Sequence, residues 1–116
     1  MQFTSDGTEG PRFDQNGYDL DLGNNVYGFL PSAVSALDIA QSFFAAGWRV
    51  RRSSWTEFEV QHTCAELELF SEKPVRFGGV VVPERIDDLL SAFTALGLSY
   101  TVELYDQDGN ETIYRA

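Results

Sequence analysis

The chain has 116 residues, of which 43% are hydrophobic and 14% aromatic, so we expect one folded domain with a core of its own. Its 18 acidic and 8 basic residues give a formal charge of −10 at pH 7. This charge argues against nucleic acid and anionic membranes as partners, because both attract basic patches.

The sequence also predicts a cytoplasmic protein. The N-terminus lacks the basic region followed by an apolar run that is typical of a signal peptide. No apolar stretch approaches the length of a membrane span. Cys64 is the single cysteine, which excludes an intrachain disulfide and fits a reducing compartment.

The first quarter of the chain combines a polar arm with two short predicted strands. Residues 1–12 are rich in Gly, Ser, Thr and Asp and predict a flexible N-terminal arm, unless Phe3 anchors them as a short edge strand. Asn16-Gly17 predicts a hairpin turn. The apolar and acidic residues that alternate over 18–22 predict a half-buried strand, and 26–30 predicts a second.

Two helices are predicted from apolar side chains at helical spacing. The first covers 33–46, with Ser32 as its N-cap, and has an apolar face broad enough for an enclosed position or a contact with another chain. The second follows Pro83, which suits the first turn of a helix, and ends at Gly97.

The remaining predicted strands follow from residues that alternate between apolar and polar. They cover 48–52, 55–62, 65–70, 76–82, 98–104 and 111–115. The turn between the first two of these strands is predicted at Ser53-Ser54.

These elements predict an α+β domain over 13–116, a two-layer sandwich with a mainly antiparallel sheet and two helices on one face. The order strand, strand, proline, helix, glycine, strand, strand occurs in 13–62 and again in 65–115. This repetition predicts a duplicated ββαββ unit, while the low identity of the two halves leaves chance similarity as the alternative.

A sheet with both helices on one face leaves its other face uncovered, and acidic residues dominate the positions expected there. These positions are Asp19, Asp21, Arg49, Arg51, Glu57, Glu59, Glu66, Glu68 and Glu103. Seven acids and two arginines give a charge of −5. Whether they form one surface depends on the strand order.

No pattern in the sequence indicates a catalytic, cofactor or metal site. Same-face carboxylates such as Glu66 and Glu68 could hold a divalent cation or act in acid–base chemistry, but the solvated face of a strand is the preferred explanation, because alternation alone accounts for them. Phe77-Gly78-Gly79 lacks the remaining residues of a phosphate-binding loop. His62 is the single histidine, which gives little support for a metal site or a catalytic triad.

The sequence therefore predicts a non-enzymatic acidic module that binds a basic protein, for example an inhibitor or immunity-type protein that masks its partner. The predicted contact residues are Asp19, Asp21, Trp55, Glu57, Glu59, Glu66, Glu68, Glu103 and Tyr105. Trp55 or Tyr105 would be the aromatic anchor.

Two alternatives stay open. One is a small-ligand-binding or enzymatic domain with a pocket near Phe77–Gly79, between the helices and the sheet. The other is a structural homodimer that forms through the first helix or through an open edge of the sheet.

Overall fold

The computed structural model describes residues 2–14 and 23–116 of the chain. The predicted turn at Asn16-Gly17 and the predicted strand over 18–22, with Asp19 and Asp21, lie outside the described residues. No helix within the described ranges is long and apolar enough to cross a membrane.

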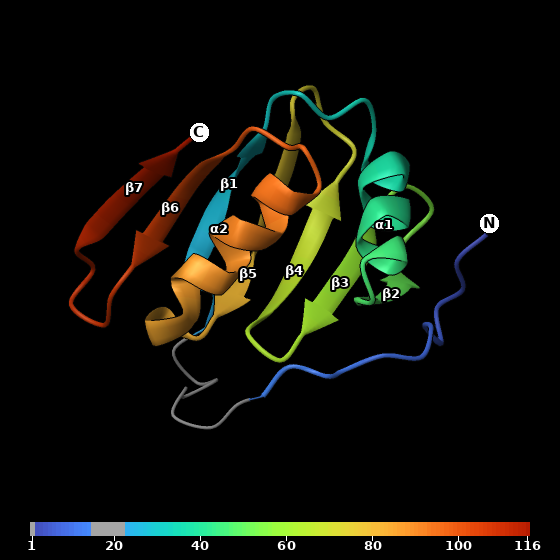
Figure 1. The fold of residues 1–116 in the computed structure, drawn as a ribbon, viewed down its shortest axis with the longest axis horizontal. Helices are drawn as coiled ribbons and strands as arrows, with labels where there is room; N and C mark the ends of the chain where they lie inside the picture. Colours follow the sequence, from blue (N-terminus) through green and yellow to red (C-terminus); the bar gives the residue numbers. More distant parts are fainter. Residues whose placement is uncertain (1, 15–22) are drawn as a thin grey trace.

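Seven strands form one antiparallel sheet in the order β2-β3-β4-β5-β1-β6-β7 (Figure 1). The strands are β1 (Val26–Leu30), β2 (Arg49–Arg52), β3 (Phe58–His62), β4 (Ala65–Phe70), β5 (Val75–Val81), β6 (Thr101–Tyr105) and β7 (Glu111–Arg115). Every neighbouring pair runs antiparallel. The predicted α+β class with an antiparallel sheet is confirmed, whereas the duplicated unit stays a prediction.

The first helix, α1 (Ala36–Ala45), begins later than predicted. Its N-cap is Ser35, whose Oγ accepts a hydrogen bond from the Asp38 backbone N–H at 3.1 Å, so the prediction of Ser32 was wrong. The chain makes a turn before this cap, in which the Ala33 N–H donates to the Leu30 carbonyl. This turn gives the chain room to cross from the end of β1 to the helix layer.

The second helix, α2 (Ile86–Ala95), follows a short 3-10 turn, η2 (Pro83–Arg85), as the proline predicted. Gly47 and Gly97 follow α1 and α2 with φ values of 93° and 73°. Because side chains clash in this left-handed region, glycine ends both helices, as predicted.

Both helices lie on the same side of the sheet in Figure 1, with α1 toward the β2–β3 end of the sheet and α2 over its middle. Phe43 of α1 and Phe93 of α2 meet edge to face at 6.1 Å between ring centroids, and Phe93 also contacts Phe77 of β5 at 5.4 Å. Gly28 of β1 leaves the space that the Phe77 ring fills, because a Cβ on Gly28 would lie 2.7 Å from the Phe77 Cζ. One core cluster therefore joins side chains of both helices to side chains of the sheet.

The turn between β2 and β3 is longer than predicted. The N–H groups of Ser53 and Ser54 both donate to the Glu57 carbonyl, so β3 begins at Phe58 and not at Trp55. The prediction of a two-residue turn was wrong because these backbone bonds hold 53–57 together as a loop.

The N-terminal arm lies along the outer edge of β2. The Arg52 N–H donates to the Thr4 carbonyl at 2.8 Å, and the Thr8 N–H donates to the Val50 carbonyl at 2.8 Å. The Phe3 ring is buried and contacts Phe58 at 6.0 Å between centroids. The arm therefore covers the backbone groups that β2 would otherwise leave without strand partners.

Candidate functional site

One row of cross-strand neighbours defines the sheet face opposite the helices. Val50, Val60 and Leu67 are fully buried toward the helices, so the residues that alternate with them lie on the other face. The strand pairing aligns them as Arg51, Glu59, Glu68, Gly78, Tyr27, Glu103 and Ile113. The row runs from an acidic half on β3 and β4 to a largely apolar half on β1, β6 and β7.

Three carboxylates gather in the acidic half, and we call Glu59, Glu66 and Glu68 the acidic cluster. Glu59 pairs with Glu68 directly across the two strands. Arg51 binds Glu59 through two hydrogen bonds, Nε to Oε1 at 3.1 Å and a terminal guanidinium nitrogen to Oε2 at 3.0 Å. Ser53 Oγ donates to Glu68 Oε1 at 3.0 Å. One guanidinium therefore faces three carboxylates.

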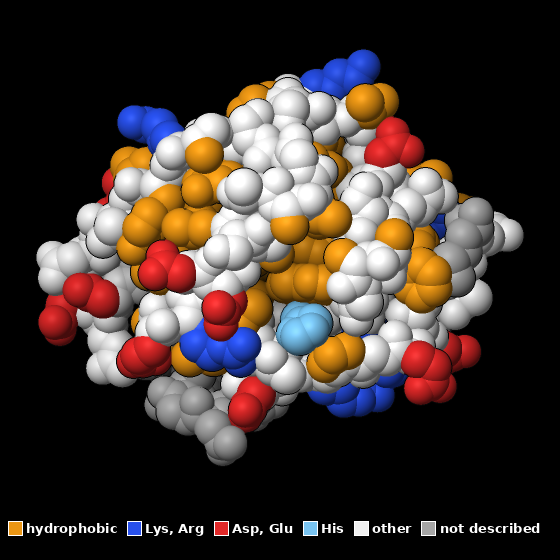
Figure 2. All heavy atoms as spheres, in the orientation of Figure 1, with side chains coloured by type: hydrophobic (Ala, Val, Ile, Leu, Met, Phe, Trp, Pro, Cys, Tyr) orange, Lys and Arg blue, Asp and Glu red, His pale blue; other side chains and the backbone are white. Residues whose placement is uncertain are grey.

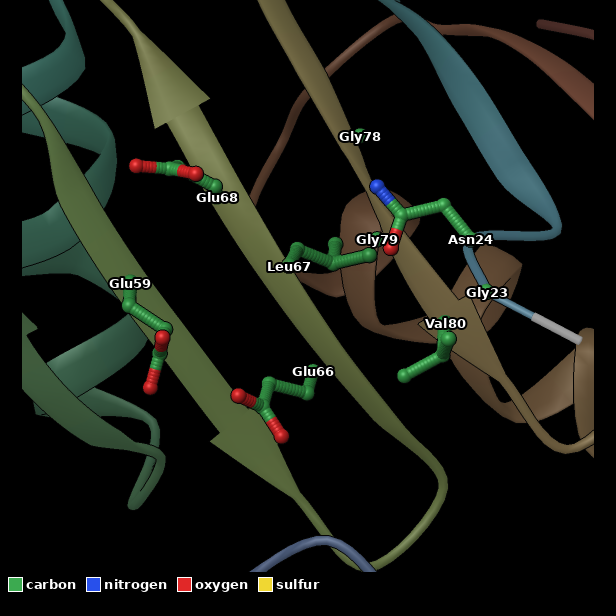
Figure 3. Close-up of a pocket in the computed structure, with 9 residues that line it drawn as sticks. All are labelled: Gly23, Asn24, Glu59, Glu66, Leu67, Glu68, Gly78, Gly79 and Val80. Carbon is green, nitrogen blue, oxygen red and sulfur yellow. The ribbon is translucent and has the colours of Figure 1, made fainter. Parts of the chain in front are cut away.

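The surroundings of Glu66 raise the pKa of its carboxyl group. Burial raises the pKa of its carboxyl group, the negative charge of Glu59 and a side-chain hydrogen bond with Glu59 raise this pKa further, and Arg51 opposes the shift. The side chains of Glu59 and Glu66 extend toward each other from neighbouring strands (Figure 3). Arg12 and Arg49 also lie near these carboxylates, in a neighbouring depression that Glu59 and Glu66 line with them.

A groove lies beside the acidic cluster (Figure 3). Its floor is formed by Gly78 and Gly79 of β5. The carboxylates of β3 and β4 lie on one side of the groove and Asn24 lies on the other. The Tyr27 ring lies close to Gly78: a Cβ added to Gly78 would lie 3.3 Å from Tyr27 Cδ1. The missing side chain of Gly78 helps to keep this part of the face concave, whereas Gly79 allows the backbones of β4 and β5 to approach closely.

An aromatic strip of Tyr27, Phe29 and Tyr105 follows the groove on the same face. Tyr27 and Phe29 are 37% and 40% exposed, and the Tyr27 ring contacts Tyr105 edge to face at 5.9 Å. The Tyr105 hydroxyl donates to Glu111 at 2.5 Å, and this hydrogen bond is the main reason that the pKa of Tyr105 is raised to about 12. The strip offers flat apolar surface that begins at Tyr27 beside the groove and extends away from the acidic cluster to Tyr105.

The structure places more arginines on this face than the sequence predicted. Arg76 and Arg115 join Arg49 and Arg51, because each alternates with a residue of the helix side. Within the described strands the face carries five carboxylates and four arginines, a net charge of −1. The expected charge of −5 included Asp19 and Asp21, which lie outside the described residues, and counted neither of the added arginines. The negative charge is local to the acidic cluster.

The other predicted contact residues lie away from the acidic cluster. Glu103 and Tyr105 are on β6, with β5 and β1 between them and the carboxylates of β4. Glu57 accepts a hydrogen bond from Ser54 Oγ within the β2–β3 turn. Trp55 is 87% exposed in that turn and borders a shallow depression with Ser5 and Arg52, not the groove.

The residues proposed for the alternative pocket divide between the two faces. Phe77 is fully buried toward the helices, whereas Gly78 and Gly79 line the groove on the opposite face. All three lie inside β5. A ligand pocket between helices and sheet at this position stays a prediction.

The residues described here include no group of three or more His, Cys, Asp or Glu side chains placed to hold a metal ion. His62 contacts the Trp48 ring at 5.3 Å, and Cys64 is buried next to the core, where burial raises the pKa of its thiol. Neither residue joins the acidic cluster.

Sequence reasoning missed two residues of the site, Tyr27 and Asn24, and it named Gly78 only for the alternative pocket between the helices and the sheet. The signal for Tyr27 was present, because Val26, Gly28 and Leu30 alternate with two aromatic residues in β1. The groove itself depends on which strands are neighbours, and β1 reaches β5 only through a long crossover.

Comparison with known proteins gives no match: no family model fits the chain, and no curated protein or solved structure matches it.

Proposed function

We propose that this protein is a non-enzymatic module that binds a basic protein through the groove and the acidic cluster. The supporting observation is the direct pairing of Glu59 with Glu68 beside Glu66, with one arginine among them. Like charges directly opposite each other destabilise a sheet. An arrangement that costs stability in the free protein is typical of a site completed by a partner.

The groove suits an arginine or lysine side chain of the partner. The aliphatic stem would lie over Gly78 and Gly79, and the Tyr27 ring would flank it. The charged head would reach Glu66 and Glu68. Arginine fits best, because its planar guanidinium binds carboxylates through two hydrogen bonds and also packs on aromatic rings.

The whole molecule would assist this encounter. In the proposal the helices and the sheet form two layers, so the face with the groove stays available to the partner. A formal charge of −10 would steer a basic protein toward the site and raise the association rate at low salt. An inhibitor or immunity-type protein that masks a basic active site is one concrete form of this function.

Capture of partners from native cell extract tests the proposal. Wild-type protein, a Glu66→Gln/Glu68→Gln variant and a Gly78→Ala variant would each be immobilised, and retained proteins would be identified by mass spectrometry. We expect a basic protein that both variants lose, because one removes charge and the other fills the groove floor. Retention should fall steeply between about 50 and 300 mM salt, since charge pairs at an exposed rim are screened.

The matched control is Glu9→Gln/Glu84→Gln, which removes the same charge from two exposed positions outside the groove. It should retain the partner almost as well as wild type. If the control loses as much partner as the Glu66/Glu68 variant, net charge alone explains the binding. If the Glu66/Glu68 and Gly78 variants both retain the partner like wild type, the groove is not the binding site.

A small organic cation is a second candidate ligand for the same groove. The raised pKa of Glu66 in a concave site favours it, because ligand-binding sites commonly hold groups with perturbed pKa values. Isothermal titration with guanidinium and short polyamines separates the two candidates. Tight binding of a free small cation would favour the small ligand, and weak binding favours a protein that supplies further contacts.

A further inference from the structure

One edge of the sheet is covered by another segment of the chain, and the other edge is open within the described residues. The N-terminal arm covers the outer edge of β2, as the bonds from Arg52 to Thr4 and from Thr8 to Val50 show. β7 forms the other edge, and in Figure 1 no described segment lies beyond it. Uncovered edge strands are ready templates for pairing with another chain.

The hydrogen-bond pattern identifies the free groups of β7. Tyr100 and Ala116 exchange two backbone hydrogen bonds at 2.9 and 3.1 Å, and the Asp106 N–H donates to the Asn110 carbonyl at 3.0 Å. Because bonding residues alternate along an antiparallel pair, Thr112 and Tyr114 bond to β6. Glu111, Ile113 and Arg115 therefore direct their backbone N–H and C=O groups outward.

These three outward residues form a self-complementary sequence. Glu111 and Arg115 carry opposite charges at equal distances on either side of Ile113. The Ile113 side chain is 42% exposed. β7 also lacks proline and lysine, the residues that commonly keep an edge strand from pairing.

We propose that two copies of this chain pair through β7, antiparallel, around a two-fold axis at Ile113. Ile113 then meets Ile113 of the second copy, and each Glu111 lies opposite Arg115 of the other chain. All three outward residues find partners in this register, which gives about six backbone hydrogen bonds. Cross-strand pairs of opposite charge select it over shifted registers.

The helix side of the sheet supports the same contact. Figure 2 shows hydrophobic side chains at the surface beside α2, over β6 and β7. Leu90 of α2, Leu104 of β6 and Tyr114 of β7 are partly buried against the core. Pairing places Tyr114 of one copy across from Thr112 of the other. The apolar surface of each copy then continues into that of its partner. This contact is independent of the groove.

Sedimentation velocity over about 1 μM to about 1 mM protein tests the proposal. We expect wild type to shift from monomer to dimer with rising concentration. Glu111→Lys places two cations opposite each other, and Arg115→Glu places two carboxylates opposite each other, so each variant alone should dissociate at least about tenfold more readily.

The charge swap separates the contact from any effect on folding. An equimolar mixture of Glu111→Lys and Arg115→Glu chains restores opposite charges in the mixed dimer, and the double variant restores them in its own dimer. Both should associate like wild type. Asp108→Lys, in the turn before β7, makes the same charge change away from the edge and should leave association unaltered. A wild type that stays monomeric throughout, or a mixture no better than its single variants, overturns the proposal.

Discussion

We expect the same substitution, glycine to alanine, to affect the stability of the protein very differently at two adjacent positions of β5, Gly78 and Gly79. A Cβ on Gly79 would lie 2.1 Å from the Glu66 carbonyl oxygen and 2.9 Å from the Leu67 Cα. Both contacts are to the backbone of β4, so no side-chain rotation can relieve them. A Cβ on Gly78 would lie 3.3 Å from the Tyr27 ring, which is partly exposed and can move, and 3.9 Å from the Val26 carbonyl oxygen, which is an ordinary contact distance.

The difference can be expressed as a free energy of unfolding. Forcing a methyl group against fixed backbone typically costs about 1–3 kcal/mol. Replacing glycine also restricts the unfolded chain, which returns about 0.4–1 kcal/mol at both positions. Because this return is the same at both positions, we expect Gly79→Ala to be less stable than Gly78→Ala by roughly 1–3 kcal/mol, with Gly78→Ala close to wild type.

Urea denaturation followed by tryptophan fluorescence measures this difference, because Trp48 is buried in the folded protein. In thermal unfolding, the Gly79→Ala midpoint should lie about 4–12 °C below the Gly78→Ala midpoint for a domain of this size. Equal stability of the two variants would show that β4 and β5 do not approach as closely as the structure has them, and would refute the account of the groove floor.

Three further predictions concern the acidic cluster, a buried amide and the thiol. Because the folded-state pKa of Glu66 is raised, its contribution to stability is full below the unfolded pKa and is lost as pH rises through the folded pKa. Glu66→Gln should therefore stabilise the protein by roughly 0.2–1 kcal/mol at pH 7, and the gain should disappear near pH 4 in urea titrations. Asn25 exchanges two buried hydrogen bonds of 2.9 Å with the Val81 backbone, so Asn25→Ala should cost about 2–4 kcal/mol in chemical denaturation, against little for the exposed Asn24→Ala. Burial raises the pKa of the Cys64 thiol, so a thiol reagent at pH 8 should modify the native protein at least about tenfold more slowly than the protein in urea.

Local patterns in the sequence were enough to predict most elements of the fold. Pro83 before α2 and Gly97 after it mark the helix because each acts within a few residues. The cap of α1 was placed wrongly at Ser32 because two serines precede that helix, and only the backbone turn at Leu30 decides between them. The β2–β3 turn was predicted too short for a similar reason. Its backbone hydrogen bonds to the Glu57 carbonyl do not change the alternation of apolar and polar residues in the sequence.

The candidate site depends on long-range pairing, which alternation cannot supply. Glu59, Glu66 and Glu68 lie on one face of the sheet, as expected. This could be predicted because β3 and β4 are neighbours in the chain as well as in the sheet. Glu103 and Tyr105 were expected with them, but β5 and β1 lie between. Tyr27 joins the groove only because β1 pairs with β5 across a large separation in sequence.

A titration of isotope-labelled protein with a short arginine peptide such as Gly-Arg-Gly tests the central claim most directly, with amide chemical shifts as the readout. We predict saturable shifts centred on Gly78, Gly79 and Glu66 that weaken with salt and disappear in Glu66→Gln/Glu68→Gln. Shifts of equal size around exposed acids of the helix side, such as Glu84 and Asp87, would contradict a defined cation site in the groove.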